Sequence, residues 1–256
     1  MGARSAGELL GRRRDQRAAQ TRDDARVPRG LRSGAAAWRF DAQGCLLRRG
    51  GPRRRSDEAA RVIPLTQLDF FGGGSRTLVD DASGHIAYFP AFVDAVTAAS
   101  WFAALRESVP WRSERRRMYD RDVDVPRQVA SYRLDDPELP GVLETAAARV
   151  REAIGAPFTS AGLNFYRDGR DSVAPHNDHL YEIREGYPIA LLSLGSTRRM
   201  TIRSKARPRR IFDLDLETGS LLLMSYETQK HYDHGIPKTR EPVGPRISLA
   251  FRVRPQ

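Results

Sequence analysis

The sequence predicts an α+β fold that is mainly β, with a double-stranded β-helix (jelly-roll) core and two or three helices buttressing one sheet. Short apolar or alternating runs separated by turn signals recur from about residue 85 to the C-terminus, and two helical patterns interrupt them. Many short strands between turn signals are typical of a double-sheet β architecture. The 256 residues are enough for one large domain with its own core.

Residues 1–60 are predicted to be a disordered basic tail, and residues 61–256 the folded domain. The tail holds 15 arginines and 7 acids, so it carries most of the net charge of +11. It lacks periodicity and cannot bury enough apolar surface to offset chain entropy. Its arginines could attract phosphates without sequence preference. Alternatively, it is a solvated tail, or a segment translated from a start codon assigned too early.

Two further observations exclude classes of protein. No stretch approaches the roughly 20 apolar residues of a membrane span, and the N-terminus lacks the apolar core of a secretory signal. Cys45 is the single cysteine, which excludes an intrachain disulfide framework and a cysteine-based zinc site. We therefore expect a monomeric cytoplasmic protein that makes no contact with membranes.

The first half of the domain contains one clear strand and two helices. His85–Phe89 predicts a short strand that ends at Pro90, and residues 94–105 predict a helix. The apolar residues at helical spacing in that helix are Val96, Ala99, Phe102 and Leu105. A second helix, residues 140–154, carries an apolar face formed by Leu143, Ala146, Ala147 and Val150. Both helices should pack on a sheet.

The second half is predicted to be strands. In Leu163–Tyr166, the side chains of Asn164 and Tyr166 share a strand face, and Asp168-Gly169 then signals a tight turn. Residues 189–194 form an almost continuous apolar run, as expected for a strand covered on both faces. Leu216, the turn at residues 219–220 and the run 221–224 predict another pair of buried strands.

A possible metal site centres on His176-Asn177-Asp178. Successive side chains of a strand point to opposite faces, so His176 and Asp178 project to the same side, about 6 to 7 Å apart along the chain. One distant imidazole, from His231 or His234, would complete the set of two histidines and one carboxylate expected of non-haem Fe(II) oxygenases. Alternatively, His176 and Asp178 lie in a polar turn.

The last strand, residues 246–254, alternates apolar and polar side chains. Arg246, Ser248 and Arg252 share one face, while the odd-numbered residues of the other face are apolar. Burying a guanidinium is costly unless an anion meets it. Two inward arginines therefore indicate a carboxylate-bearing ligand or fixed carboxylate partners. Alternatively, this is an edge strand whose arginines lie in water.

Residues 198–210, here called the basic strip, contain seven basic residues and no acid. We expect a hairpin whose outer side contacts phosphates beside the mouth of the site. Alternatively, the strip is only a solvated face. Its members are Arg198, Arg199, Arg203, Lys205, Arg207, Arg209 and Arg210.

Six motifs occur in order along the second half of the chain: residues 164–169 (NFYRDG), 176–178 (HND), 192–195 (LSLG), 219–224 (GSLLLM), 234–238 (HGIPK) and 245–252 (PRISLAFR). Through them the sequence resembles the AlkB-type 2-oxoglutarate- and Fe(II)-dependent dioxygenases, a family that repairs alkylated nucleic acid. The resemblance is dense from about residue 163 onward and thinner over 86–162. It does not reach the first sixty residues.

The resemblance implies a catalytic metal site and a cosubstrate pocket. Fe(II) would be bound by His176, Asp178 and His234, because His234 matches the family motif whereas His231 does not. Arg246 would pair with the distal carboxylate of 2-oxoglutarate. The other cosubstrate is O2. Asn164, Tyr166 and Arg252 would hold the other end of 2-oxoglutarate, or Arg252 would orient Asp178. Ser248 lies where many members have asparagine, which departs from the family pattern.

The implied reaction is oxidative demethylation of N-alkylated bases in DNA or RNA, with release of succinate, CO2 and formaldehyde. A duplex substrate would need its damaged base flipped out. In the family, residues 112–133 correspond to a lid over the substrate, although its longer hairpin is shortened here. Tyr132 would stack on the base, or it is a half-buried strand aromatic. The remaining candidates for substrate contact are Arg127, Arg198, Arg199 and Arg203.

Two other functions remain open. The same core could hydroxylate or demethylate RNA, a tRNA base or a protein side chain. Alternatively, the chain could be a nucleic-acid-binding module with an inactive iron site. The full set of expected iron and cosubstrate residues favours an enzyme.

Overall fold

The computed structural model describes residues 38–40, 46–48, 74–118 and 121–255, with only the backbone described for 38–40, 46–48, 114–118 and 121–124. Most of the predicted tail therefore lies outside the described residues. Within it, β1 (Trp38–Phe40) and β2 (Leu46–Arg48) pair as an antiparallel ladder. Aromatic and apolar residues in these two short runs favour the extended conformation. The predicted disorder of the tail otherwise falls on residues outside those described, so it stays a prediction.

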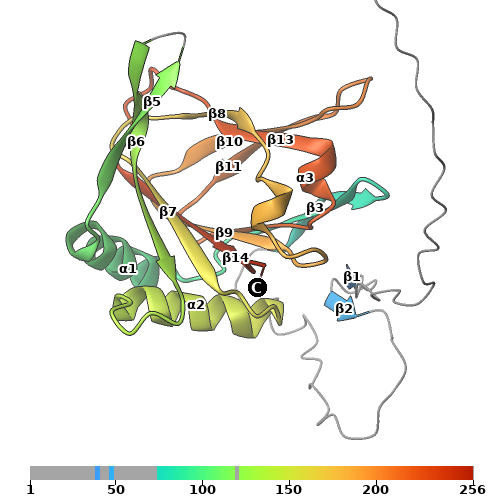
Figure 1. Cartoon of the computed structure of the whole chain (residues 1–256), viewed down its shortest axis with the longest axis horizontal. Helices are drawn as coiled ribbons and strands as arrows, with labels where there is room; N and C mark the ends of the chain where they lie inside the picture. The colour runs from blue at the N-terminus through green and yellow to red at the C-terminus, as the bar shows by residue number, and fades with distance from the viewer. Residues whose placement is uncertain (1–37, 41–45, 49–73, 119–120, 256) are drawn as a thin grey trace, which may run out of the picture. The chain divides into compact units, whose positions relative to one another are not determined.

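The domain is built on two antiparallel sheets (Figure 1). The larger sheet has eight strands in the order β3-β4-β12-β9-β14-β7-β6-β5: Arg76–Asp81, Gly84–Phe89, Leu221–Met224, Ile189–Gly195, Arg246–Arg252, Ser160–Tyr166, Arg121–Arg133 and Arg112–Met118. The smaller sheet has four strands in the order β11-β10-β13-β8: Ile211–Leu216, Arg198–Ser204, Tyr232–Ile236 and Val173–His176. The architecture is mainly β, as predicted.

Two helices cover one face of the larger sheet (Figure 1). α2 (Gly141–Ile154) buries the four residues of its predicted apolar face. In α1 (Ala95–Ser108), Asp94 caps the N-terminus by accepting from the amides of residues 96 and 97. The predicted face of α1 is wrong in part, since Val96 is 81% exposed. The face that packs is Ala98, Trp101, Phe102 and Leu105, which follows the i, i+3, i+4, i+7 stripe of a helix more closely.

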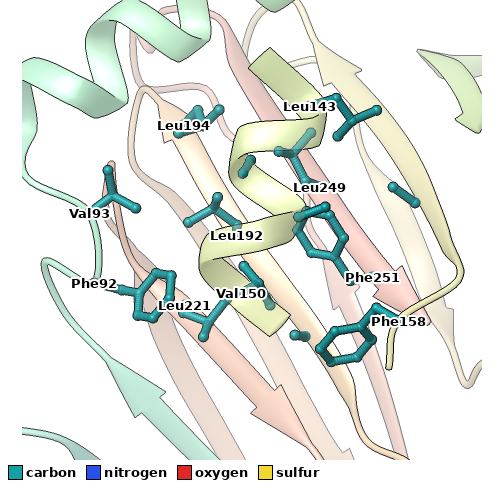
Figure 2. Packing of buried hydrophobic residues seen from close by; sticks show 14 of the residues in the cluster. Phe92, Val93, Leu143, Val150, Phe158, Leu192, Leu194, Leu221, Leu249 and Phe251 are labelled. Carbon is teal, nitrogen blue, oxygen red and sulfur yellow. The ribbon is translucent and has the colours of Figure 1, made fainter. Parts of the chain in front are cut away.

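The alternation along β14 directs one side of the strand to the helices. Leu249 and Phe251 belong to the core beneath α2, and Figure 2 shows them with Leu143 and Val150 of that helix. β14 pairs with β9 on one side and β7 on the other, so it is a central strand. The alternative of an edge strand with arginines in water is therefore wrong.

The opposite face of the larger sheet packs against the smaller sheet. Ile86, Leu191 and Leu222 from the larger sheet share a buried cluster with Met200 and Ile202 from the smaller one. The described part of the domain thus has three layers: helices, large sheet and small sheet. The polar side chains of β14 and β7 face the core between the two sheets, where a ligand would be enclosed.

The chain crosses between the sheets after β11. The predicted strand pair around Gly219 does not form, because β11 belongs to the small sheet whereas β12 pairs with β4 and β9. Gly219 adopts φ +74°, and a Cβ there would lie 2.2 Å from the carbonyl oxygen of Val93. The crossing therefore requires glycine.

Two short helical segments follow other strands: η2 (Leu180–Glu182) and α3 (Thr228–His231). None of the described helices is long and apolar enough to span a membrane.

Candidate metal centre and cosubstrate pocket

Three possible metal ligands converge at the end of the smaller sheet. His176 is the last residue of β8, and its register partner on β13 is His234. Their ring centroids are 4.6 Å apart. Asp178 follows two residues after β8, and the ligand atoms of the three side chains all lie within 4.8 Å of one another. This set of donors fits one divalent ion of the kind bound by two histidines and a carboxylate.

The ring of His176 is oriented for metal binding, and the ring of His234 is uncharged. Nδ1 of His176 lies 3.0 Å from the carbonyl oxygen of Ala174, so a proton on Nδ1 leaves Nε2 free as a ligand. His234 is buried, and burial together with the nearby His176 lowers its pKa to about 4. At neutral pH the His234 imidazole is therefore neutral and has a free lone pair. His179 and His231 are exposed, and in the described part of the chain they lie outside the ligand group.

Arg252 fixes the carboxylate ligand. Its Nε and Nη2 donate to the same oxygen, Oδ2 of Asp178, at 3.0 and 2.8 Å, and Nη1 donates to the carbonyl of Ala250. Burial acts to raise the pKa of Asp178, but the charge of Arg252 and its hydrogen bonds lower it below its ordinary value. The carboxylate therefore stays ionised, with Oδ1 left for a metal. Of the two roles expected for Arg252, the structure shows the one on Asp178.

A second support of the ligand loop was not predicted from the sequence. Gln229 of α3, 1% exposed, accepts a hydrogen bond from the backbone amide of Asp178 at 3.0 Å. Lys205 donates to Oδ1 of Asn177 at 2.9 Å and to the carbonyl of Gln229 at 3.0 Å. Gln229 is 51 residues from Asp178 in a polar stretch, so no sequence pattern marks it. Lys205, although exposed, therefore helps to hold the loop that carries Asp178.

Arg246 is a buried cation with incomplete hydrogen bonding. Its side chain is 1% exposed, and Nη2 donates to Oγ of Ser193 at 2.9 Å. Among the described residues, its Nε and Nη1 are buried without a hydrogen-bond partner. Burial lowers the pKa of Arg246. Burying a guanidinium whose donors have no partner raises the free energy of the folded state unless an anion accepts hydrogen bonds from them. This position therefore fits the carboxylate of a small ligand.

The polar residues beside Arg246 lie on the same face of the sheet. Ser248 is buried, and its register partner on β7 is Asn164. Oδ1 of Asn164 accepts from Nε of Arg127 at 2.7 Å. Tyr166 is buried, and its ring lies 5.2 Å from Cζ of Arg246. Burial raises the pKa of Tyr166 against the opposing charge of Arg246, so the phenol keeps its proton as a hydrogen-bond donor.

The comparisons with known proteins agree with this site. Residues 85–252 match the family model described as the 2OG-Fe(II) oxygenase superfamily. The chain belongs to this superfamily. The match runs from β4 to the end of β14, so it includes every ligand and pocket residue of the preceding paragraphs. The AlkB-type resemblance is also confirmed, because the relatives found carry AlkB-homologue names.

The relatives of this 2OG-Fe(II) oxygenase domain are matched over part of their length. The chain is 38% identical over 118 residues to the DNA oxidative demethylase ALKBH2 of Mus musculus, covering 43% of the chain and 49% of that protein. It is 32% identical over 188 residues to the alpha-ketoglutarate-dependent dioxygenase alkB homolog 3 of Homo sapiens, covering 66% and 65% respectively. The chain thus spans about half to two thirds of these relatives.

Tyr132 does not lie on the sheet face that carries Asn164 and Arg246. Its register partner is Ala161, and both belong to the core on the helix side of the larger sheet. Because alternate residues of a strand point to opposite faces, the side chain is turned away from the metal centre. The base-stacking role predicted for Tyr132 is therefore wrong, and the alternative of a half-buried strand aromatic is correct.

The basic strip is largely neutralised by acids of neighbouring strands. Arg199 forms an ion pair with Asp215 at 2.9 Å, and Nε of Arg203 lies 4.0 Å from Asp233. The prediction of a surface phosphate contact is wrong for Arg198, which is 3% exposed. The sequence count of seven bases and no acid missed these pairs because the acids come from β11 and β13. In the described part of the chain, no ion pair involves Arg207 or Arg209, which are exposed in the β10–β11 turn.

Proposed function

We propose that the chain is an Fe(II)- and 2-oxoglutarate-dependent dioxygenase that oxidatively demethylates N-alkylated bases, with DNA as the first candidate substrate and RNA as the second. The observation that carries the proposal is Arg246, a buried guanidinium with two donors that have no partner among the described residues. It lies on the same sheet face as Arg252, which supports Asp178. The printed names of the relatives, which include a DNA oxidative demethylase, support the substrate class.

We infer that the two sheets form the double-stranded β-helix expected for the superfamily. The antiparallel pairing, the shared core between the sheets and the metal ligands at one end of the smaller sheet support this. The enclosed face of the larger sheet then becomes the cosubstrate pocket. We also expect a monomer, as predicted from the sequence.

The residues present fit the iron and the cosubstrate. His176, Asp178 and His234 would bind the iron, and Arg246 would receive the distal carboxylate of 2-oxoglutarate with its free Nε and Nη1. When bound, the iron supplies the oxidation of a C–H bond by O2, coupled to oxidative decarboxylation of 2-oxoglutarate. The balance is one 2-oxoglutarate, one O2 and one N-methyl group giving succinate, CO2 and an N-hydroxymethyl group. That group then leaves as formaldehyde and restores the N–H.

The other side chains would prepare the site for this reaction. Arg252 keeps Asp178 ionised and oriented, and burial keeps His234 neutral. Ser193 holds Arg246 from the β9 side. Such second partners fix ligand geometry before the substrate arrives. For contact with the nucleic-acid backbone, the best remaining candidates from the basic strip are Arg207 and Arg209, which are exposed and form no ion pair with the described residues.

The test is succinate formation with a panel of oligonucleotides that carry N-methylated bases in single-stranded DNA, duplex DNA or RNA. Unmethylated oligonucleotides of the same sequence measure the uncoupled background. We expect methylation-dependent succinate, abolished in His234→Ala and retained in His231→Ala. The absence of methylation-dependent succinate on all three backbones would refute the substrate class. Succinate retained by His234→Ala would refute the metal assignment.

A further inference from the structure

Arg198 is a second buried cation near the cosubstrate pocket. Its neighbour Arg199 lies on the solvent face of β10, but alternation turns Arg198 inward, where it is 3% exposed. Its Nη1 donates to the carbonyl of Asp168 at 2.9 Å. Its Nη2 donates to the carbonyls of Asp171 and Pro237, both at 2.8 Å. All of these acceptors are neutral backbone groups.

The nearest carboxylates are already used by other arginines. The Asp171 side chain is bound by Nε and Nη2 of Arg167, both at 2.8 Å. The Asp168 side chain is bound by Arg170 at 2.7 Å. Each of these acids is thus paired with an arginine of its own loop. The charge of Arg198 is therefore solvated by carbonyl dipoles but not neutralised by a counterion of its own.

Arg198 and Arg246 lie close to the same phenol ring. Cζ of Arg198 is 5.7 Å and Cζ of Arg246 is 5.2 Å from the ring centroid of Tyr166. The two guanidinium carbons are therefore no more than about 11 Å apart, a distance over which charges in a protein interior interact appreciably. Two buried positive charges that lack their own anions would make this end of the pocket strongly attractive to a dianion.

We propose that Arg198 is a positioning residue for the cosubstrate, which acts by charge to favour 2-oxo dicarboxylates over 2-oxo monocarboxylates. The proposal rests on the proposed function, because it takes 2-oxoglutarate as the ligand of Arg246. Arg198 does not need to touch the ligand, since its hydrogen bonds go to carbonyls. For a carboxylate bound beside Arg246, with the limit of about 11 Å between the two guanidinium carbons taken as its distance from Arg198 and an effective dielectric constant of about 20, one unit charge would change the binding constant roughly tenfold.

The experiment is calorimetric binding to the full-length protein loaded with Mn(II), which allows binding to be measured without turnover. The ligands are 2-oxoglutarate and 2-oxopentanoate, which has the same carbon chain but no distal carboxylate. Arg198→Gln and Arg198→Met both remove the charge, and the glutamine keeps an amide donor for the carbonyls. Arg198→Lys keeps the charge. Arg199→Met is the matched control, since it removes an exposed arginine from the adjacent position.

We expect the two neutral variants, or whichever of them folds, to bind 2-oxoglutarate roughly tenfold more weakly and 2-oxopentanoate within about twofold of wild type. Arg198→Lys and Arg199→Met should keep the wild-type preference for the dicarboxylate. Equal losses for both ligands in every Arg198 variant would show that Arg198 only ties the loops together, and would overturn the proposal. If wild type binds no 2-oxoglutarate, the proposed function itself fails. If Arg246→Met loses the dicarboxylate preference but the Arg198 variants keep it, only this inference fails.

Discussion

Replacing Arg252 by methionine should destabilise the metal-free protein. In the wild type, Arg252 makes two hydrogen bonds to one carboxylate oxygen of Asp178, and the two side chains are 16% and 12% exposed. Methionine preserves much of the apolar volume but leaves Asp178 as a buried charge without its main counterion. Breaking a buried ion pair from one side costs about 3 to 5 kcal/mol, and the residual exposure here favours the lower value of about 3 kcal/mol.

The assay is urea unfolding followed by the fluorescence of Trp101 and Trp111, which pack against the core beneath the helices. With a urea dependence of about 2 to 3 kcal/mol per molar, the midpoint should fall by about 1 M or slightly more. The matched control is Arg133→Met. Arg133 also donates to one carboxylate through Nε and Nη2, in this case to Oδ1 and Oδ2 of Asp135. Because these side chains are 80% and 68% exposed, no measurable shift is expected.

The pH dependence of this difference has a definite sign. The pKa of folded Asp178 is lowered from its ordinary value of 3.8, so the ionised carboxylate stabilises the wild type above that pH. This stabilisation is lost as the pH falls through the lower folded value. The gap between wild type and Arg252→Met should therefore be largest near neutral pH and shrink below about pH 4. Equal urea midpoints at pH 7 would show that the Arg252–Asp178 pair does not support the fold.

Three further predictions concern the ligands. Arg246→Lys should raise the apparent KM for 2-oxoglutarate at least tenfold. A charged hydrogen bond is worth about 1.5 to 3 kcal/mol, and the single ammonium group of lysine cannot reproduce the paired donors of a guanidinium. An unchanged KM would show that Arg246 does not bind the cosubstrate. His234→Ala should lose Mn(II) binding in an equilibrium titration whereas His231→Ala keeps it, and the reverse result would make the ligand assignment wrong. Replacing Arg207 and Arg209 together by serine should weaken oligonucleotide binding and reduce its salt slope by about two; an unchanged slope would exclude both as phosphate contacts.

Local patterns predicted the parts of the site that depend on alternation. The shared face of Asn164 and Tyr166, and the inward arginines of the last strand, follow from the two-residue period of a strand. The two-residue alternation of side chains is kept where both faces of a strand are covered by other residues. The apolar face of α2 was predicted for the same kind of reason, since its helical spacing is regular.

Features that depend on pairing between distant strands could not be predicted. Asp215 neutralises Arg199 only because β10 and β11 align these two residues in register. Gln229 reaches the Asp178 amide only because α3 precedes β13, which pairs with β8. Tyr132 faces the helices because its register places it opposite Ala161. In each case the sequence defines the residue type, whereas the register of the sheet decides its surroundings.

The central claim is that this site removes a methyl group from a nucleobase at the expense of 2-oxoglutarate. The most direct measurement is the mass of a methylated oligonucleotide after incubation with the protein, Fe(II), 2-oxoglutarate and O2, with succinate and formaldehyde quantified in the same sample. We predict the loss of one CH2 unit per methylated base, matched by one succinate and one formaldehyde. Succinate formation with an oligonucleotide of unchanged mass, on both DNA and RNA, would contradict the claim.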